Sequence, residues 1–291
     1  MINKKGFVMR VVSKIGVIGA GQMGRGIAQV ASQSGFETHL FDSSSESLER
    51  GAAFIKEQLA RGVSKGKWTE EASQKAQESL QLETSLEGLS DCDLVIEAAT
   101  ERKDVKFKIF QECDRIIKEG ALLASNTSSI SITEIASQTK RPSKVAGMHF
   151  MNPVPVMKLV EGIKGLETSN ETFDSVASVA KAMGKIFVKA NDVPGFAVNR
   201  ILMPMINEAV YALYEGVASV EDIDSAMKLC KNQTMGPLEL ADFIGLDTCL
   251  AIMGVLHEGL GDTKYRPCPL LKKYVLAGRF GKKSGRGFYE Y

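Results

Sequence analysis

Apolar and polar residues are distributed differently in two parts of the chain. Up to residue 190, short apolar runs alternate with segments whose apolar residues recur at helical spacing, whereas beyond residue 195 the strand-like runs cease. The segment between them, Asn191-Asp192-Val193-Pro194-Gly195, consists largely of turn-forming residues. We therefore predict an α/β domain over residues 1–190, with a mostly parallel sheet and helices on both faces, followed by a smaller all-helical domain over residues 191–291.

The same pattern predicts the elements of the first domain. Apolar runs predict strands at residues 15–18, 38–41, 93–98, 121–125, 145–150 and 159–163, and an alternating run predicts an edge strand at 185–189. Helical spacing predicts helices that end at residues 35 and 80, and others over 47–62, 105–118, 130–137 and 168–183. The last of these helices is predicted to open on a capping box formed by Thr168 and Glu171.

The second domain is predicted to be a small helical bundle. Its helices are expected over residues 196–214, 220–230, 238–244 and 248–260, and its tail ends in glycine-rich turns. The first helix contains Pro204, which should kink it. Because this helix is apolar on nearly all sides, it must be buried within the bundle or against a second subunit.

A glycine motif, Gly19-x-Gly21-x-x-Gly24, joins the first predicted strand to the first predicted helix. Gly19 permits a tight turn, Gly21 lets the backbone approach a pyrophosphate, and Gly24 lets the helix pack close to the strand. The phosphates would then bind the N–H groups at the positive end of the helix. The motif predicts a Rossmann-type domain that binds a dinucleotide, with a purely structural turn as the alternative.

Asp42 follows the second predicted strand, about 20 residues beyond the glycine motif. A carboxylate at this place can accept hydrogen bonds from the adenine ribose and would repel a 2′-phosphate. The next residues, Ser43 to Ser45, include neither Arg nor Lys. We therefore predict NAD rather than NADP as the cofactor, while the alternative is that Asp42 caps a helix.

Composition and charge narrow the class of protein. A length of 291 residues suggests about two domains. The 36 basic and 35 acidic residues give a net charge of +1, which does not favour nucleic acid or a membrane surface as a partner. The five cysteines are scattered without a C-x-x-C pair, which favours reduced thiols in the cytoplasm and neither disulfides nor a metal. No apolar run is long enough to span a bilayer, and residues 1–13 are expected to form a short extension rather than a targeting signal.

A long insertion lies between the second and third predicted strands. Its first helix is followed by a short basic loop that contains Lys65 and Lys67. These lysines could be ordinary surface charges or could hold a substrate that carries phosphate. A P-loop is excluded, because Gly62 and Gly66 have the wrong spacing and Trp68 stands where Ser or Thr would be needed.

His149 is the histidine whose position favours catalysis. It lies at the end of a predicted strand, whereas His39 is expected to be a packed strand residue and His257 a surface residue. Oxidation of an alcohol needs a base for the hydroxyl proton, and imidazole titrates near neutral pH. Glu161, on the next extended segment, could orient His149 and stabilise its charged form. The spacing alone leaves open that Glu161 is an ordinary charge at a strand edge.

The chain resembles the L-3-hydroxyacyl-CoA dehydrogenase family over nearly its full length, most closely the short-chain members that act on 3-hydroxybutyryl-CoA. The matching blocks occur in family order and are GVIGAGQMG, DLVIEAATE, ASNTSSISIT, GMHFMNPVPVMKLVE, PGFAVNR, MGPLELADFIGLD and FGKKSGRGFYEY. Together these blocks are far more specific than the glycine motif alone.

The resemblance implies a role for each matching residue. It makes His149 the base and Glu161 its orienting carboxylate. It places Ser128 and Asn152 near the reacting oxygen and the nicotinamide. It also implies that Asn199, from the helical domain, contributes to the same site. The implied cofactor contacts are Gly19, Gly21, Gly24, Asp42, Glu101, Lys106, Ser128, Asn152 and Lys283. Lys65 and Ser128 are the implied contacts of CoA, whereas Gln58 replaces a CoA-binding serine of some members.

The resemblance further implies an acyl-CoA substrate and a homodimer formed through the helical domain. It also implies a cleft between the domains that narrows on binding. Two other functions stay open from the residues themselves. One is a dehydrogenase of a CoA-free hydroxy acid or sugar acid, against which the basic loop argues mildly. The other is a non-catalytic protein that binds NAD.

Overall fold

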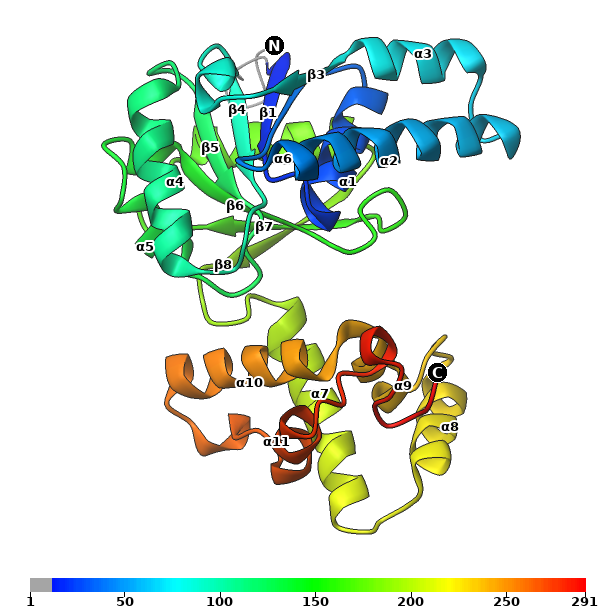
Figure 1. The fold of residues 1–291 in the computed structure, drawn as a ribbon. Coiled ribbons are helices and arrows are strands. Elements are labelled where there is room, and N and C mark those ends of the chain that lie inside the picture. The colour runs from blue at the N-terminus through cyan, green and yellow to red at the C-terminus, as the bar shows by residue number, and fades with distance from the viewer. Residues whose placement is uncertain (1–11) are drawn as a thin grey trace. The chain divides into compact units, whose positions relative to one another are not determined.

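The computed structural model describes residues 12–291 and divides into two compact units, Met1–Asp192 and Val193–Tyr291 (Figure 1). The division falls two residues after the predicted one, because the last strand of the first unit continues through Asn191. The short extension expected at residues 1–13 lies, up to residue 11, outside the described residues.

The first unit contains an eight-stranded sheet in the order β3-β2-β1-β4-β5-β6-β7-β8. All neighbouring strands are parallel except β6 and β7, which are antiparallel. The strands are β1 (Lys14–Ile18), β2 (Glu37–Phe41), β3 (Leu80–Glu83), β4 (Leu94–Glu97), β5 (Leu122–Ser125), β6 (Val145–Phe150), β7 (Leu159–Lys164) and β8 (Ile186–Asn191). The predicted α/β fold with a mostly parallel sheet is confirmed. Strand β3 was missed, because it has only four residues and follows a helix almost directly.

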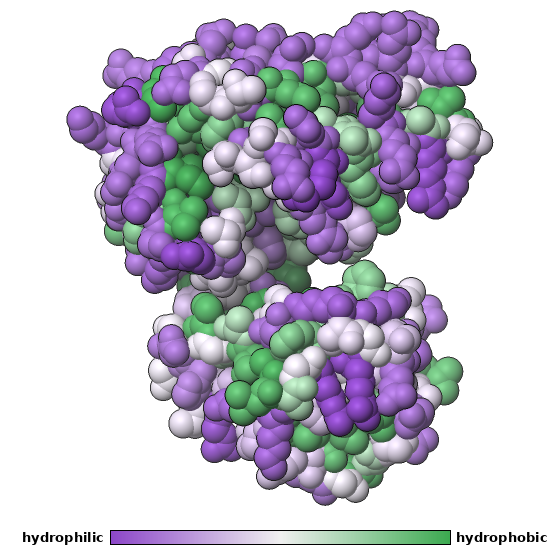
Figure 2. Space-filling model, viewed as in Figure 1, coloured by the Kyte–Doolittle hydropathy of each residue, from purple (hydrophilic) through white to green (hydrophobic). Residues whose placement is uncertain are grey.

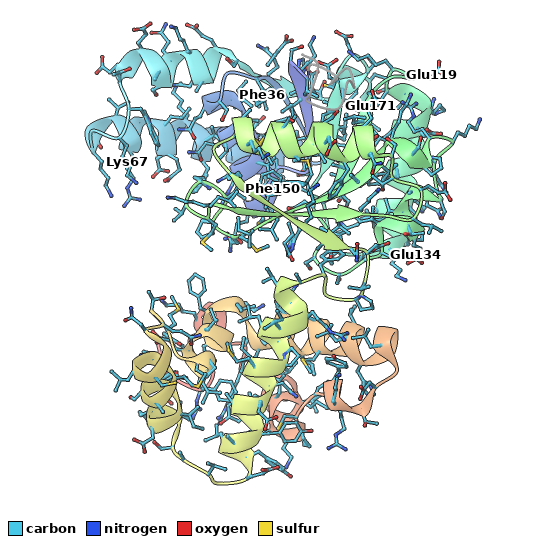
Figure 3. All side chains as sticks on the ribbon, turned by 180° about the vertical axis from the view of Figure 1, so that it is seen from behind. Phe36, Lys67, Glu119, Glu134, Phe150 and Glu171 are labelled. Atoms are coloured by element: carbon cyan, nitrogen blue, oxygen red, sulfur yellow. The ribbon has the colours of Figure 1, made fainter. Side chains whose placement is uncertain are left out.

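Helices cover both faces of this sheet. They are α1 (Gln22–Gln33), α2 (Ser45–Ser64), α3 (Glu70–Glu78), α4 (Lys103–Ile116), α5 (Ile132–Ala136) and α6 (Asn170–Ala182), with 3-10 turns η1 (Leu86–Leu89) and η2 (Pro142–Lys144). Residues of α1, α2 and α6 share one hydrophobic core with the strands, and Figure 3 shows α6 lying across the sheet that contains Phe150. Ile132 of α5 packs against Gly147 and Ile163 on the opposite face.

The predicted capping box of α6 is wrong by one residue. Ser169 is the N-cap, since its hydroxyl accepts a hydrogen bond from the N–H of Thr172 at 3.0 Å. Thr168 is buried instead, and its hydroxyl donates to the carbonyl of Val145 in β6. Because that contact already uses the Thr168 side chain, the next hydroxyl along the chain caps the helix.

The second unit is all-helical, as predicted. Its helices are α7 (Val198–Tyr214), α8 (Val220–Lys231), α9 (Pro237–Ile244), α10 (Leu246–Leu260) and α11 (Pro269–Leu276), with 3-10 turns η3 (Thr263–Tyr265) and η4 (Lys282–Ser284). Helix α7 begins two residues after the predicted start, because Gly195 and Phe196 have φ values of +76° and +50°, which are not helical. Helix α11, which precedes the glycine-rich turns of the tail, was not predicted.

The core of the second unit forms around α7, whose residues Met203, Ile206 and Val210 are buried. The C-terminal tail is fastened by Asp242 of α9, whose carboxylate accepts hydrogen bonds from the N–H groups of Phe288 and Tyr289. His257, expected at the surface, is half-buried in α10. All five cysteines are free, and only Cys230 is exposed.

The surface in Figure 2 is mostly polar over α2 and α3. Within residues 12–291, no single helix is both long and apolar enough to cross a membrane. Only α9 and α10 taken together pass that test, and they are bent by 98° relative to each other.

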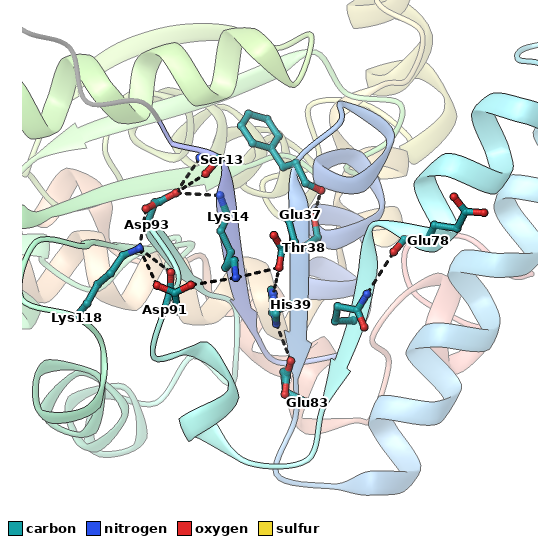
Figure 4. A network of polar contacts seen from close by, with 12 residues as sticks. Ser13, Lys14, Glu37, Thr38, His39, Glu78, Glu83, Asp91, Asp93 and Lys118 are labelled. Atoms are coloured by element: carbon teal, nitrogen blue, oxygen red, sulfur yellow. Dashed lines mark hydrogen bonds and ion pairs between the residues drawn. The ribbon is translucent and has the colours of Figure 1, made fainter.

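A network of charged residues joins the starts of the parallel strands (Figure 4). Asp93, directly before β4, accepts hydrogen bonds from the N–H groups of Ser13 and Lys14 and pairs with Lys118 at 2.8 Å. His39 is a packed strand residue, as predicted, and its ring contacts the carboxylates of Glu83 and Glu37.

Asp93→Asn should lower the free energy of unfolding by about 1–3 kcal/mol at pH 7. Burial raises the pKa of Asp93, but the hydrogen bonds from Lys118, Ser13 and Lys14 outweigh it and leave the pKa well below the ordinary 3.8. The stabilisation is therefore complete above about pH 4 and is lost as the pH falls further. Urea unfolding between pH 3 and 8 measures this. A difference from the unchanged protein that stays constant over that range would contradict it, and Glu49→Gln, at an exposed position of α2 outside this network, is the control.

Candidate active site

The carboxyl ends of β1, β2 and β4 meet at a cavity of about 620 Å³. It is lined by Ile18, Gly19, Gly21, Gln22, Met23, Phe41, Asp42, Ser43, Leu86, Ala98, Ala99, Thr100, Val105, Ile109 and Glu112. The first two glycines of the motif, Gly19 and Gly21, therefore lie with Asp42 on the wall of one cavity, at the edge of the sheet where open α/β folds bind ligands.

The glycine motif has the conformation that its sequence predicts. Gly19 has φ +101°, and a side chain there would lie 2.7 Å from the carbonyl oxygen of Ala98. A side-chain carbon at Gly24 would lie 1.7 Å from the carbonyl oxygen of Gly19, so only glycine lets α1 start so close to the end of β1. At Gly21 the same carbon would meet nothing within 4 Å. The turn therefore leaves space beside Gly21, on the cavity side.

Asp42 holds this turn in place. Its carboxylate accepts hydrogen bonds from the N–H of Ala20 at 2.7 Å and from the N–H of Ser44 at 2.9 Å. Ser44, and not Asp42, caps α2, which removes the alternative interpretation of Asp42 as a helix cap. Each carboxylate oxygen can still accept a further hydrogen bond. The described lining residues include Asp42 and Glu112 but no Lys or Arg, so the cavity suits a dinucleotide without a 2′-phosphate.

Glu101 accepts several hydrogen bonds from the loop that follows β5. Its Oε1 accepts hydrogen bonds from the hydroxyls of Thr127, Ser128 and Ser129 at 2.7, 3.1 and 3.0 Å, and from the N–H groups of Ser128 and Ser129. Burial raises the pKa of Glu101, but the charge of Lys106 and these hydrogen bonds outweigh that effect and lower the pKa overall. Glu101 is therefore an ionised acceptor that fixes the position of Ser128.

Beneath Glu101 lies a buried ion pair. The Lys106 ammonium is 2.7 and 2.8 Å from the two carboxylate oxygens of Glu97 and 3.4 Å from Glu101. The side chains of Lys106 and Glu97 are each 1% exposed. Ser125 and the N–H of Ala99 also donate to Glu97. Glu97 was not among the predicted site residues, although a charged residue inside an otherwise apolar strand was a usable signal.

His149 and Glu161 face each other across the antiparallel strands β6 and β7. The Nδ1 atom of His149 lies 2.9 Å from Oε2 of Glu161, and the two residues are 8% and 0% exposed. The pairing register places the two residues directly opposite each other, on the face where α5 packs. The structure thus brings together the histidine and the carboxylate that the sequence had singled out separately.

Asn152 follows β6 and is exposed, two residues beyond the end of the strand. Asn126, at the end of β5, accepts a hydrogen bond from the N–H of Phe150 and so ties the ends of the two strands together. Asn126, like Glu97, was not among the predicted site residues.

The remaining predicted residues lie elsewhere. Lys65 is the exposed C-cap of α2, and Lys67 lies at the tip of the α2–α3 hairpin (Figure 3). Trp68 packs over Gly62 and stiffens this hairpin by donating to the carbonyl of Leu59. In the second unit, Asn199 is 7% exposed in the first turn of α7. Lys283, in η4, forms an ion pair with Asp247.

Comparison with known proteins assigns the chain to a family. The family model described as "3-hydroxyacyl-CoA dehydrogenase, NAD binding domain" matches residues 14–193, and the one described as "3-hydroxyacyl-CoA dehydrogenase, C-terminal domain" matches residues 195–291. The chain belongs to the 3-hydroxyacyl-CoA dehydrogenase family. Its first unit is an NAD-binding domain, and the cavity beside the glycine turn and Asp42 fits that cofactor.

Individual members of the family are similar over almost the whole chain. A 3-hydroxybutyryl-CoA dehydrogenase of Bradyrhizobium diazoefficiens is 57% identical over 281 residues, which cover 97% of this chain and 96% of that protein. The mitochondrial hydroxyacyl-coenzyme A dehydrogenase of Homo sapiens is 44% identical, with coverage of 97% and 92%. The crystal structure of (S)-3-hydroxybutyryl-CoA dehydrogenase from Ralstonia eutropha has a TM-score of 0.95 and 48% identity, with coverage of 97% and 99%.

Within residues 12–291 no group of three or more His, Cys, Asp or Glu side chains is placed to hold a metal ion.

Lys106→Met should lower the free energy of unfolding by about 3–5 kcal/mol, because it leaves the Glu97 carboxylate buried without its counter-ion. Adding Glu97→Met removes that charge and should recover about 1 kcal/mol or more. Urea unfolding of Lys106→Met, Glu97→Met and the double variant measures both effects, with Lys108→Met at an exposed position of α4 as the control. Simple additivity of the two single losses would contradict the pairing.

Proposed function

We propose that this protein oxidises short-chain L-3-hydroxyacyl-CoA, with 3-hydroxybutyryl-CoA as the main substrate, to the 3-oxoacyl-CoA with NAD, and catalyses the reverse reaction. The observation that carries the proposal is the buried contact between His149 and Glu161 within an NAD-binding domain of this family. The names of the relatives from Bradyrhizobium diazoefficiens and Ralstonia eutropha support the choice of substrate.

His149 acts as the general base. NAD, when bound, accepts the hydride from C3 of the substrate. As the C3–H bond breaks, His149 accepts the proton of the C3 hydroxyl, and in the reverse direction it returns that proton. Because Nδ1 contacts Glu161, we assign proton transfer to Nε2. Glu161 holds the ring in this tautomer and stabilises the imidazolium that forms.

Ser128, Asn152 and Asn199 serve as polar partners of the reacting groups. Ser128 is held by Glu101, as the hydrogen bonds from its N–H and hydroxyl indicate. We assign Ser128 and Asn152 to the reacting oxygen and the nicotinamide, where donors stabilise developing charge. Asn199 is assigned to the same reaction from the second unit.

The cofactor contacts are proposed in two groups. Gly19, Gly21 and Asp42 hold the pyrophosphate and the adenine ribose, as their places on the cavity wall support. Gly24 contributes by letting α1 start close to the end of β1. Glu101, Lys106 and Lys283 complete the set, and the buried contacts of Lys106 indicate that it acts through Glu97 and Glu101.

CoA is proposed to bind along the α2–α3 hairpin. Lys65, exposed at the end of α2, is a suitable contact for a phosphate, and Ser128 would lie at the acyl end. Binding energy from the distant CoA would hold the short acyl group in line for hydride transfer.

The second unit is proposed to complete the substrate site and to form a homodimer. Ile201, Val217, Leu229 and Leu276 of this unit are 71–87% exposed, and a dimer interface that covered them would remove apolar surface from water. The five free cysteines favour a reducing compartment such as the cytoplasm.

A dehydrogenase of a CoA-free hydroxy acid is the alternative function, and such an enzyme would oxidise the free acid faster than the CoA thioester. Membership of a dehydrogenase family argues against a non-catalytic role.

The protein should oxidise NADH with acetoacetyl-CoA, and His149→Ala should lower kcat by about 100-fold or more. Glu161→Gln should lower kcat by about 10-fold or more, because the amide cannot stabilise the imidazolium equally well. Loss of NADH absorbance measures these rates, and Glu171→Gln, on α6, is the control. Full kcat in Glu161→Gln would refute the dyad. Faster turnover of free acetoacetate than of its CoA ester would favour the alternative function.

Lys65→Ala should raise KM for acetoacetyl-CoA by about 3- to 10-fold while leaving kcat and KM for NADH unchanged. The reason is that its ammonium is proposed to contact only the remote part of the substrate. Lys67→Ala is the matched control, since it removes the same charge from the same hairpin. Equal effects of both variants would indicate a general electrostatic attraction instead of a specific contact.

A further inference from the structure

The loop that joins β6 to β7 connects the two residues of the dyad. This connecting loop, residues 151–158, follows His149 and carries Asn152, and Glu161 lies three residues beyond it. Its conformation therefore affects the position of Asn152 directly and influences how β6 and β7 pair.

The connecting loop has few hydrogen-bond donors of its own. Pro153 and Pro155 lack an N–H group, and the N–H groups of Val156 and Met157 both donate back to the carbonyl of Pro153. The carbonyls of Val154, Met157 and Lys158 must therefore find donors outside the loop.

Two consecutive residues supply those donors. The ammonium of Lys185 donates to the carbonyls of Val154 at 2.5 Å and Met157 at 2.9 Å. The N–H of Ile186, at the start of β8, donates to the carbonyl of Lys158 at 2.7 Å. The loop is thereby fastened to the start of the edge strand at three carbonyls.

Lys185 is itself rigidly placed. Gly184, with φ +71°, ends α6, and the N–H of Lys185 donates to the carbonyl of Ala180. This pattern of hydrogen bonds is that of a Schellman motif, which fixes the chain where it leaves a helix. The Lys185 ammonium therefore projects from a fixed point of the backbone.

The position of Lys185 has a cost in stability. The residue is 8% exposed, and within residues 12–291 no carboxylate lies within 4.0 Å of its nitrogen. Burial lowers the pKa of the ammonium below its ordinary 10.5. A buried cation that is compensated only by carbonyl dipoles is unfavourable compared with an apolar side chain. A lysine at this buried position is therefore expected to have a function that an apolar side chain cannot perform.

The loop also contacts the helix of the glycine motif. Val154 is 2% exposed and packs so closely on Gly26 of α1 that a side-chain carbon at Gly26 would lie 3.0 Å from its Cβ. Val154 is thus held on one side by α1, and its carbonyl is held on the other by Lys185. Through Val154, the hydrogen bond from Lys185 therefore connects the loop that carries Asn152 to α1, the helix that starts at the cofactor cavity.

We propose that Lys185 is a positioning residue for the dehydrogenase reaction: by holding the carbonyls of Val154 and Met157, it fixes the connecting loop and so places Asn152 beside the reacting group. This proposal rests on the proposed function, because it requires Asn152 to act on the bound substrate or cofactor. Lys185 itself touches neither the cofactor cavity nor His149 among the contacts described.

Lys185→Met should lower kcat for acetoacetyl-CoA reduction by about 10- to 100-fold, because a displacement of about 1 Å in a positioning group is enough for such a loss. KM for NADH should stay within about 3-fold, because the glycine turn and Asp42 are unchanged. Lys181→Met, at an exposed position of α6, is the matched control and should behave like the unchanged protein. Urea unfolding shows how much folded protein each assay contains.

A double-mutant cycle separates positioning from general stability. In an Asn152→Ala background, Lys185→Met should lower kcat by less than about 3-fold, because the residue through which it acts is already absent. If Lys185→Met does not fold, Lys185→Gln takes its place, since its shorter amide can still reach toward one carbonyl. Equal losses in both backgrounds, or a kcat like that of Lys181→Met, would overturn the proposal. No turnover by the unchanged protein would refute the proposed function itself.

Discussion

The site depends on one change of strand direction in the sheet. In the order of the sheet, the strands from β3 to β6 all run in one direction, β7 is antiparallel to β6, and β8 is parallel to β7. A parallel neighbour would need a long crossover, whereas this reversal needs only a loop. It places Glu161 directly opposite His149, where their side chains touch inside the protein.

Buried charges are the second constraint, since each needs a partner in an interior that water does not reach. Glu97 and Lys106 neutralise each other, and the second contact of Lys106 keeps Glu101 ionised as the acceptor for the loop after β5. Lys185 is stabilised instead by carbonyls of the connecting loop. Polar residues thus fix the backbone at the carboxyl ends of β4, β5 and β6, and the apolar core fixes the sheet beneath them.

Much of this arrangement could be predicted from the sequence. The two-part fold, the glycine turn and the positions of most strands follow from local patterns, because they depend on spacing along the chain. The start of α7 was wrong by two residues, since Gly195 and Phe196 adopt positive φ values that the apolar pattern does not report. The cap of α6 was wrong by one residue, since the Thr168 hydroxyl is used in a contact with Val145, far away in the sequence. The short β3 and the helix α11 were missed, because their segments carry too few periodic residues for a prediction.

The sequence by itself determined the class of cofactor, through the glycines and Asp42, and singled out His149 as the base. The tertiary structure decided that Glu161 contacts His149, that Lys106 pairs with Glu97 and lies 3.4 Å from Glu101, and that Lys185 donates to carbonyls of the connecting loop. The physical reason is that local patterns report the periodicity and conformation of single segments. Contacts between side chains far apart in the chain depend on strand register and burial, which exist only once the sheet has formed.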